Sequence, residues 1–160
     1  MRLTVAVQTR NALNLAFCIL ITGSGLAQGP GPCSDPPTLC ISTNRCAPGT
    51  ATTCTVTLAK NGGSATATPD LAGVSANNLF CLAPNKVLKF KTVGGSKTFI
   101  VTFSASHPPS PSVTGPLRGS SSNPVSITPT VKACYKYSIE VCESPGSCGS
   151  TDPKIIISDE

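Results

Sequence analysis

The sequence predicts an all-β fold, an antiparallel β-sandwich of about seven short strands stapled by disulfide bonds. Two observations indicate this class. Runs of alternating apolar and polar residues, rich in β-branched side chains, are separated by turns that contain glycine and proline. Nine cysteines occur in 160 residues, whereas no stretch has the periodicity of an amphipathic helix longer than a turn or two.

Residues 1–27 are predicted to be a signal peptide. Arg2 and Arg10 precede the apolar run LAFCILI, and small residues lead to a cleavage site after Ala27. The run is much shorter than the roughly 20 residues of a membrane span. A lipoprotein is the other alternative, because Cys18 lies in the run, but bulky Phe17 stands where lipid modification requires a small residue. We therefore expect a freely exported protein, secreted or periplasmic, with no membrane span after cleavage.

The cysteine count and the charge of the exported chain follow from this cleavage. Nine cysteines become eight, and the formal net charge falls from +5 to +3, since two of the twelve basic residues are lost. An even number of cysteines in an exported chain is typical of a disulfide framework. No cluster of lysine and arginine stands beside aromatic residues, so nucleic-acid binding is not expected.

Residues 28–50 are predicted to be an irregular, cysteine- and proline-rich N-terminal segment, because proline and glycine interrupt every run in it. A single β-sandwich domain is expected over residues 51–160. TATTCTVTLAK alternates cleanly and is its first predicted strand. Residues 61–78 are expected to be turn and loop, followed by the short apolar run LFCLA, which bears Cys81.

The strongest local pattern is KVLKFKTVGGSKTFIVTFSA. Apolar residues alternate with lysines before the Gly-Gly pair, and Phe99, Val101 and Phe103 alternate with other residues after it. Glycine supplies the positive φ angles that tight turns require, so the pattern predicts a β-hairpin.

A stretch of serine, proline and glycine, residues 106–124, is long for a connection within a compact domain, so it is predicted to be a functional or a mobile loop. His107 and Arg118 are its candidate binding residues, and a solvated loop without a role is the alternative. Strands are then predicted at VSIT, VKACYKYSIEV and KIIIS.

The long strand CYKYSIEVC carries two cysteines that cannot pair with each other. Cys134 and Cys142 lie eight residues apart, about 26 Å on an extended strand, whereas the Cα atoms of a disulfide lie within about 7 Å. The alternation places four apolar residues on the core face, namely Tyr135, Tyr137, Ile139 and Val141.

Two disulfides are predicted. Cys142–Cys148 would close a loop around Pro145-Gly146, the pair favoured in a type II turn. Cys54–Cys81 would join two neighbouring short strands. The partners of the other four cysteines stay open, because eight cysteines permit 105 connectivities; these are Cys33, Cys40, Cys46 and Cys134.

The part of the chain from TFIVTFSASHPP to YKYSIEVCESPGSCGSTDPKIIIS resembles the closing part of cupredoxin-like domains, which are Greek-key β-sandwiches. The resemblance covers residues 86–158, and its ending is similar to that of small secreted bacterial domains. It implies that His107 and Cys142 match copper ligands. The loop after Cys142 holds neither histidine nor methionine, however, and His107 is the only histidine. A blue-copper site needs two histidines and a cysteine, so the resemblance implies a site that has been lost.

No cofactor or other metal is expected. The cysteine spacings do not match the short paired spacings of zinc sites, and the carboxylates are too scattered for calcium. A nucleophilic enzyme would need a base beside its serine or cysteine, and His107 lies in a proline-rich loop.

We therefore expect a non-enzymatic structural or binding module, Ig-like or cupredoxin-like in fold, whose partner would be a cell-surface or extracellular protein or a glycan. One alternative is a degenerate cupredoxin-type domain that binds a metal and transfers electrons. Another is a secreted hydrolase or inhibitor.

Overall fold

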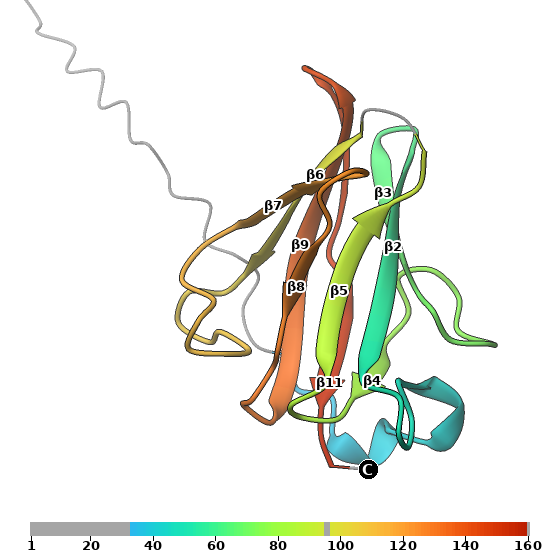
Figure 1. Cartoon of the computed structure of the whole chain (residues 1–160), viewed down its shortest axis with the longest axis vertical. Coiled ribbons are helices and arrows are strands. Elements are labelled where there is room, and N and C mark those ends of the chain that lie inside the picture. Colours follow the sequence, from blue (N-terminus) through green and yellow to red (C-terminus); the bar gives the residue numbers. More distant parts are fainter. Residues whose placement is uncertain (1–32, 95–96, 160) are drawn as a thin grey trace, which may run out of the picture.

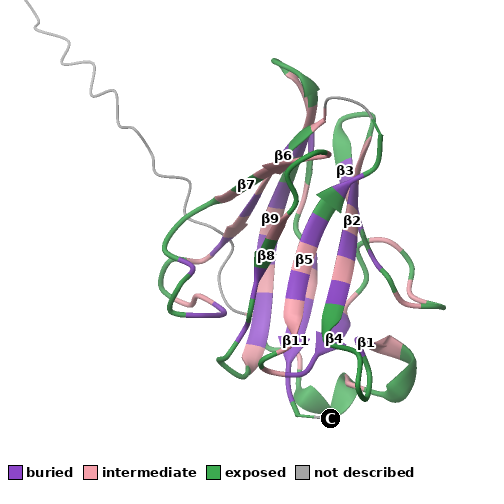
Figure 2. Ribbon diagram, viewed as in Figure 1, coloured by how far each residue is buried: buried purple, intermediate pink, exposed green. Residues whose placement is uncertain are grey.

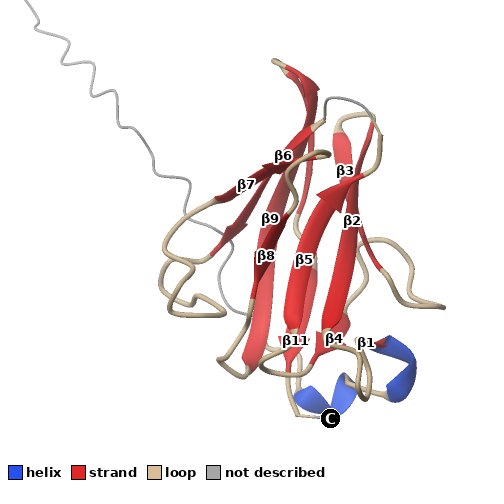
Figure 3. Cartoon of the chain, in the orientation of Figure 1, coloured by secondary structure: helices blue, strands red, loops and turns tan. Residues whose placement is uncertain are grey.

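The computed structural model describes residues 33–94 and 97–159, so the predicted signal peptide lies outside the described residues (Figure 1). The described chain is all-β, with only two short 3₁₀ turns, η1 (Pro37–Leu39) and η2 (Ser42–Asn44) (Figure 3). Its eleven strands are β1 (Arg45–Cys46), β2 (Thr53–Asn61), β3 (Ser64–Pro69), β4 (Phe80–Leu82), β5 (Val87–Thr92), β6 (Thr98–Phe103), β7 (Leu117–Ser120), β8 (Val125–Ile127), β9 (Ala133–Ser144), β10 (Ser147–Thr151) and β11 (Lys154–Ile157).

The strands form a sandwich-like arrangement of two layers. The first sheet has the order β7-β6-β9-β11-β4-β1, and the second has the order β3-β2-β5-β8. Strand β10 connects the two sheets, because it pairs with β9 on one side and with β3 on the other. Pairing is mixed rather than purely antiparallel, since β1–β4, β4–β11, β2–β5 and β3–β10 are parallel. The expectation of seven antiparallel strands is thus too simple.

Strand β9 supplies the centre of the core, as its alternation predicts. Tyr135, Tyr137, Ile139 and Val141 are all buried. The Tyr137 ring lies between Phe103 of its own sheet and Phe90 of the facing sheet, with centroid distances of 5.2 and 5.8 Å. Alternating buried and partly exposed residues mark β2 and β5 in the same way (Figure 2). Burying each large apolar side chain stabilises the fold by about 1.5–3 kcal/mol.

The hairpin predicted over residues 86–105 is wrong, although both of its strands form. Strand β5 pairs with β2 and β8 in the second sheet, and β6 pairs with β7 and β9 in the first sheet. Phe90 and Phe99 are both buried in one core. The two strands therefore lie in different layers, on opposite sides of the core.

Four strands lie where the sequence predicts irregular structure, loops or turns. Strand β1 lies within residues 28–50, β3 occupies part of residues 61–78, β7 lies within residues 106–124, and β10 follows the Pro145-Gly146 turn. The apolar residues of β3 are small, namely Ala65, Ala67 and Pro69. Small residues give weak hydrophobic alternation.

Residues 33–46, which we call the strap, run over the outer face of the first sheet and end in β1 at the edge of that sheet. Ile156 pairs with Cys81 and with Cys134, so these three residues share the face turned away from the main core. They form a second buried cluster beneath Cys33 and Cys40. The strap is fixed there by two disulfides, Cys33–Cys134 and Cys40–Cys81.

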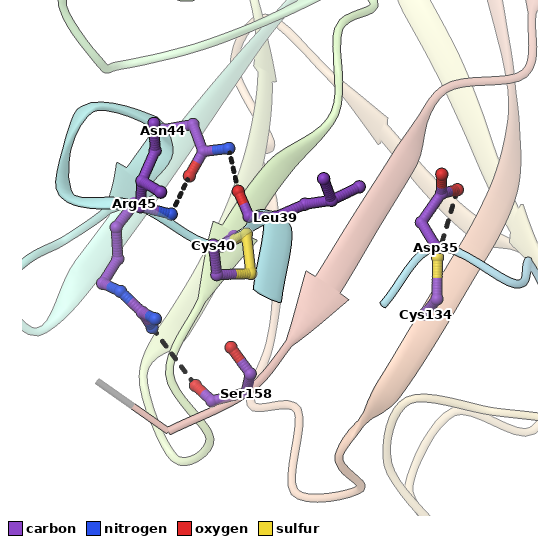
Figure 4. Close-up of a disulfide and its surroundings, with 9 residues drawn as sticks. Asp35, Leu39, Cys40, Asn44, Arg45, Cys134 and Ser158 are labelled. Atoms are coloured by element: carbon purple, nitrogen blue, oxygen red, sulfur yellow. Dashed lines mark hydrogen bonds between the residues drawn. A yellow bond between two sulfur atoms is a disulfide. The ribbon is translucent and has the colours of Figure 1, made fainter. Parts of the chain in front are cut away.

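Polar contacts also hold the strap in shape (Figure 4). The Asn44 side chain accepts a hydrogen bond from the Ile41 N–H at 3.0 Å and donates one to the Leu39 carbonyl at 2.8 Å. Arg45 donates to the carbonyl of Ser158 at 3.3 Å, which ties the strap to the end of β11.

Four disulfides join all the cysteines of the described chain. Cys142–Cys148 is present, its two residues directly opposite each other in the β9–β10 pairing. The predicted Cys54–Cys81 bond is wrong, because Cys54 pairs with Cys46 and Cys81 with Cys40. Cys54 belongs to the main core, whereas Cys81 lies on the outer face of the first sheet. A whole sheet therefore separates their side chains.

Four disulfides indicate an oxidising, extracellular setting. No helix in the described residues is long and apolar enough to cross a membrane.

Candidate functional site

His107 lies at the start of the connection between β6 and β7, and it is half-buried. Its ring packs on Tyr135 with a centroid distance of 5.6 Å, and its backbone N–H donates to the Ser104 carbonyl at 3.1 Å. The only histidine of the chain thus contacts an aromatic residue near the start of β9.

The structure does not bring the two predicted binding residues, His107 and Arg118, together. Arg118 is exposed on β7 and stands opposite Ile100, which in turn stands opposite Glu140 of β9. Glu140 is five residues, or about 17 Å, along the strand from Tyr135, where His107 packs. The two residues therefore cannot form one contact point.

His107 and Cys142, the ligand pair that the cupredoxin resemblance implies, are also apart. Cys142 lies seven residues from Tyr135 on the same continuous strand, which is about 23 Å. Its sulfur is bonded to Cys148.

Potential ligand atoms meet in two other places. Cys33, Asp35 and Cys134 form one group, and Glu140, Cys142 and Cys148 form the other, with ligand atoms within 4.8 Å of one another. The cysteines of both groups are disulfide-bonded. A disulfide sulfur is not the thiolate that binds metals, so the described residues give neither group a thiolate ligand.

The connection over residues 104–116 is held against the body of the protein. The Pro109 carbonyl accepts hydrogen bonds from the N–H groups of Thr130 and Val131, at 2.9 and 3.3 Å. Ser110 and Val113 are buried. This loop is therefore packed on the segment that leads into β9.

Two surface hollows lie where the strap meets β9 and β11. The larger has a volume of about 530 Å³ and lies between residues 33–37 of the strap, residues 132–134 and residues 157–159. A second hollow of about 440 Å³ shares residues 33–36 and is lined also by Lys136 and Lys154. We call the two hollows together the strap groove. Asp35 contributes to both parts of it.

Lysines and aspartates form ion pairs in and beside the strap groove. Lys136 and Lys154 are directly opposite in the β9–β11 pairing, a position in which like charges repel. Asp35 relieves this repulsion, because its Oδ2 lies 2.7 Å from the Nζ of Lys154. Asp152 Oδ2 lies 3.6 Å from Lys136 Nζ, and Lys132 pairs with Asp159 at 2.7 Å at the other end of the groove.

These ion pairs can exchange partners. Exposed salt bridges contribute only about 0–1 kcal/mol each, so charged or hydroxyl groups of a ligand can replace one member at little cost. The disulfide Cys33–Cys134 fixes one wall, and Asp35 also lies 3.7 Å from the sulfur of Cys134 (Figure 4). A wall fixed before binding lowers the entropic cost of association.

No pattern in the sequence singles out the charged residues of the groove. Asp35 and Lys154 are separated by 119 residues, and no local pattern announces their contact. The one usable indication was the presence of three cysteines in residues 33–46, which required this segment to be fixed to something.

The opposite end of the sandwich carries a second group of charges. Glu143 of β9 lies 3.2 Å from Lys97 and 3.4 Å from Lys60. Hydrogen bonds from Lys97 and then from Lys60 hold the pKa of the Glu143 carboxyl below its usual range. This group links the end of β2 to β9 and to the segment before β6, and so joins the two sheets.

No protein-family model matches the chain, and no curated protein is significantly similar to it.

Proposed function

We propose that this protein is an exported, non-enzymatic binding or structural module, and that it holds an extracellular polypeptide or glycan in the strap groove. The observation that supports this most directly is the construction of the groove. Its walls come from three distant parts of the chain, and a disulfide fixes them. Its lysine–aspartate pairs offer both donors and acceptors to a partner.

The fold we propose is a Greek-key sandwich of the Ig-like or cupredoxin-like kind. Two features support it. The chain crosses between the sheets from β5 to β6, from β7 to β8 and from β8 to β9. Tyr135, near the start of β9, donates its hydroxyl hydrogen to the Val131 carbonyl at 2.8 Å. A tyrosine bonded to the backbone a few residues upstream is the tyrosine corner of such sandwiches.

Binding to the groove can be tested on arrays of glycans and extracellular peptides. The Lys132→Glu variant reverses a charge in the groove, and Lys91→Glu makes the same change on an exposed residue of β5. We expect ligands that bind the wild type to lose affinity for Lys132→Glu and to keep it for Lys91→Glu. Equal binding by all three proteins would refute the groove as the site.

The array and native mass spectrometry together address the two alternatives. Cleavage of an array glycan would favour the secreted hydrolase. A bound metal in native mass spectrometry of the secreted protein would favour the electron-transfer domain. The distance between His107 and Cys142 gives that alternative no support from those two residues.

A further inference from the structure

Part of the outer face of the first sheet is not covered by the strap. It is formed by β7, β6, β9 and β10 at the end of the sandwich away from the strap (Figure 1). The side chains that point outward there are mostly small and polar, as in Thr98, Thr102 and Ser138. Ile100 stands at its centre and is only partly buried.

Two opposite charges flank Ile100 on this face. Arg118 of β7 is directly opposite Ile100 on one side, and Glu140 of β9 is directly opposite it on the other. Neighbouring strands lie about 4.8 Å apart, so the Cα atoms of Arg118 and Glu140 are separated by about 10 Å across β6. Both are exposed, and within residues 33–94 and 97–159 neither forms an ion pair.

We propose that this row is a self-complementary surface through which two copies of the chain associate face to face. The twofold axis would run along β6, in the plane between the copies. It would place Ile100 on Ile100, and Arg118 of each copy on Glu140 of the other. Closed dimers with one shared patch are the commonest form of protein oligomer.

The charges also determine how the two copies are oriented in the dimer. A twofold axis perpendicular to β6 would set Arg118 against Arg118 and Glu140 against Glu140, which like-charge repulsion disfavours. The axis along β6 produces two attractive pairs instead. Sheets that pack face to face keep their strand directions within about 30°, which suits this orientation.

The dimer is weak and sensitive to salt. The uncovered face is only four strands wide, whereas a stable interface buries about 800 Å² on each partner. Its two ion pairs lie near the solvent, where salt screens them strongly. This surface is separate from the strap groove, so failure of one proposal leaves the other standing.

The proposal can be tested by exchanging the two charges. Self-association of the secreted protein is measured by sedimentation velocity at low salt over a series of protein concentrations. Arg118→Glu and Glu140→Arg should each weaken self-association by about tenfold or more. The variant carrying both substitutions should recover the wild-type affinity. An equimolar mixture of the two single variants should associate more tightly than either variant does alone.

Two matched variants control for net charge. Lys91→Glu and Asp70→Arg make the same charge changes at exposed residues outside this face, and they should self-associate like the wild type. Thermal unfolding checks that every variant is folded. A wild type that stays monomeric, single variants that associate normally, or a doubly substituted chain that does not recover would each overturn the proposal.

Discussion

Tyr135 and Tyr137 face the same core, yet their hydroxyl groups differ in what they contact. The Tyr135 hydroxyl donates to the Val131 carbonyl at 2.8 Å. The Tyr137 hydroxyl is buried and has no hydrogen-bond partner among the described residues. Burial raises the pKa of both phenols, so both remain neutral at physiological pH.

Removing the hydroxyl of Tyr135 and removing that of Tyr137 should therefore have opposite effects on the free energy of unfolding. Tyr135→Phe loses the hydrogen bond to the Val131 carbonyl, which should lower the free energy of unfolding by about 0.5–1.5 kcal/mol. Tyr137→Phe removes an unsatisfied buried group, so stability should be unchanged or rise by up to about 1 kcal/mol. Urea denaturation of the two variants measures both effects. A larger loss for Tyr137→Phe would mean that its hydroxyl has a partner.

Gly119 is a second position where adding or removing one atom should change stability. A Cβ atom built there would collide with the ring of Phe99, the residue paired with it across β6 and β7. We expect Gly119→Ala to lower the free energy of unfolding by about 1–3 kcal/mol, the usual cost of overpacking. Thermal or urea unfolding provides the measurement.

Gly115→Ala is the matched control for this change. A Cβ atom at Gly115 would have no atom within 4 Å, and its φ angle is not in the left-handed region. If Gly115→Ala and Gly119→Ala are equally destabilising, the contact with Phe99 is not the cause.

At the scale of elements, β9 organises the first sheet, because β6 pairs along one side of it and β11 and β10 share the other. Its end is attached to the second sheet through the ion pair of Glu143 with Lys60 of β2, and to the segment before β6 through Lys97. The pKa of Glu143 is lowered in the folded state, so the carboxylate stabilises the fold above its unfolded pKa. That contribution is lost as the pH falls through the folded pKa.

Glu143→Gln should remove this pH dependence. The difference in Tm between the wild type and the variant should be constant above about pH 5 and shrink below about pH 4. Glu140→Gln serves as the control, since Glu140 forms no ion pair within the described residues. A difference that grows as the pH falls would contradict the assigned sign.

At the scale of the whole molecule, the disulfides differ in how much of the chain they constrain. Cys33–Cys134 spans 101 residues and fixes the strap, whereas Cys142–Cys148 spans 6 residues within one hairpin. Chain entropy predicts that removing the longer link costs about 2.5 kcal/mol more than removing the shorter one.

Paired substitutions can measure this difference. We expect Cys33→Ala with Cys134→Ala to be much less stable in urea than Cys142→Ala with Cys148→Ala. The strap groove should also lose its wall in the first variant and keep it in the second. Equal stability would mean that native-state contacts, rather than the unfolded chain, determine the contribution of these bonds.

The all-β class follows from the sequence alone, as do the positions of most strands and the faces that they bury. Alternation in VLKFKT, TFIVTF and CYKYSIEVC identified the buried residues, because a strand turns successive side chains to opposite faces. It also placed Cys142–Cys148, since a hairpin of that length brings its two ends together without help from the rest of the chain.

Tertiary packing, by contrast, sets which strands pair, which cysteines meet and where the groove forms. A local pattern shows which face of a strand is buried, but not which strand lies beside it. The pattern of β5 and β6 therefore predicts a hairpin, although the two strands belong to different sheets. Likewise Cys54 and Cys81 lie on opposite sides of a sheet, and Asp35 reaches Lys154 across 119 residues. These contacts depend on how the layers stack, and that is a property of the whole buried core rather than of any one segment.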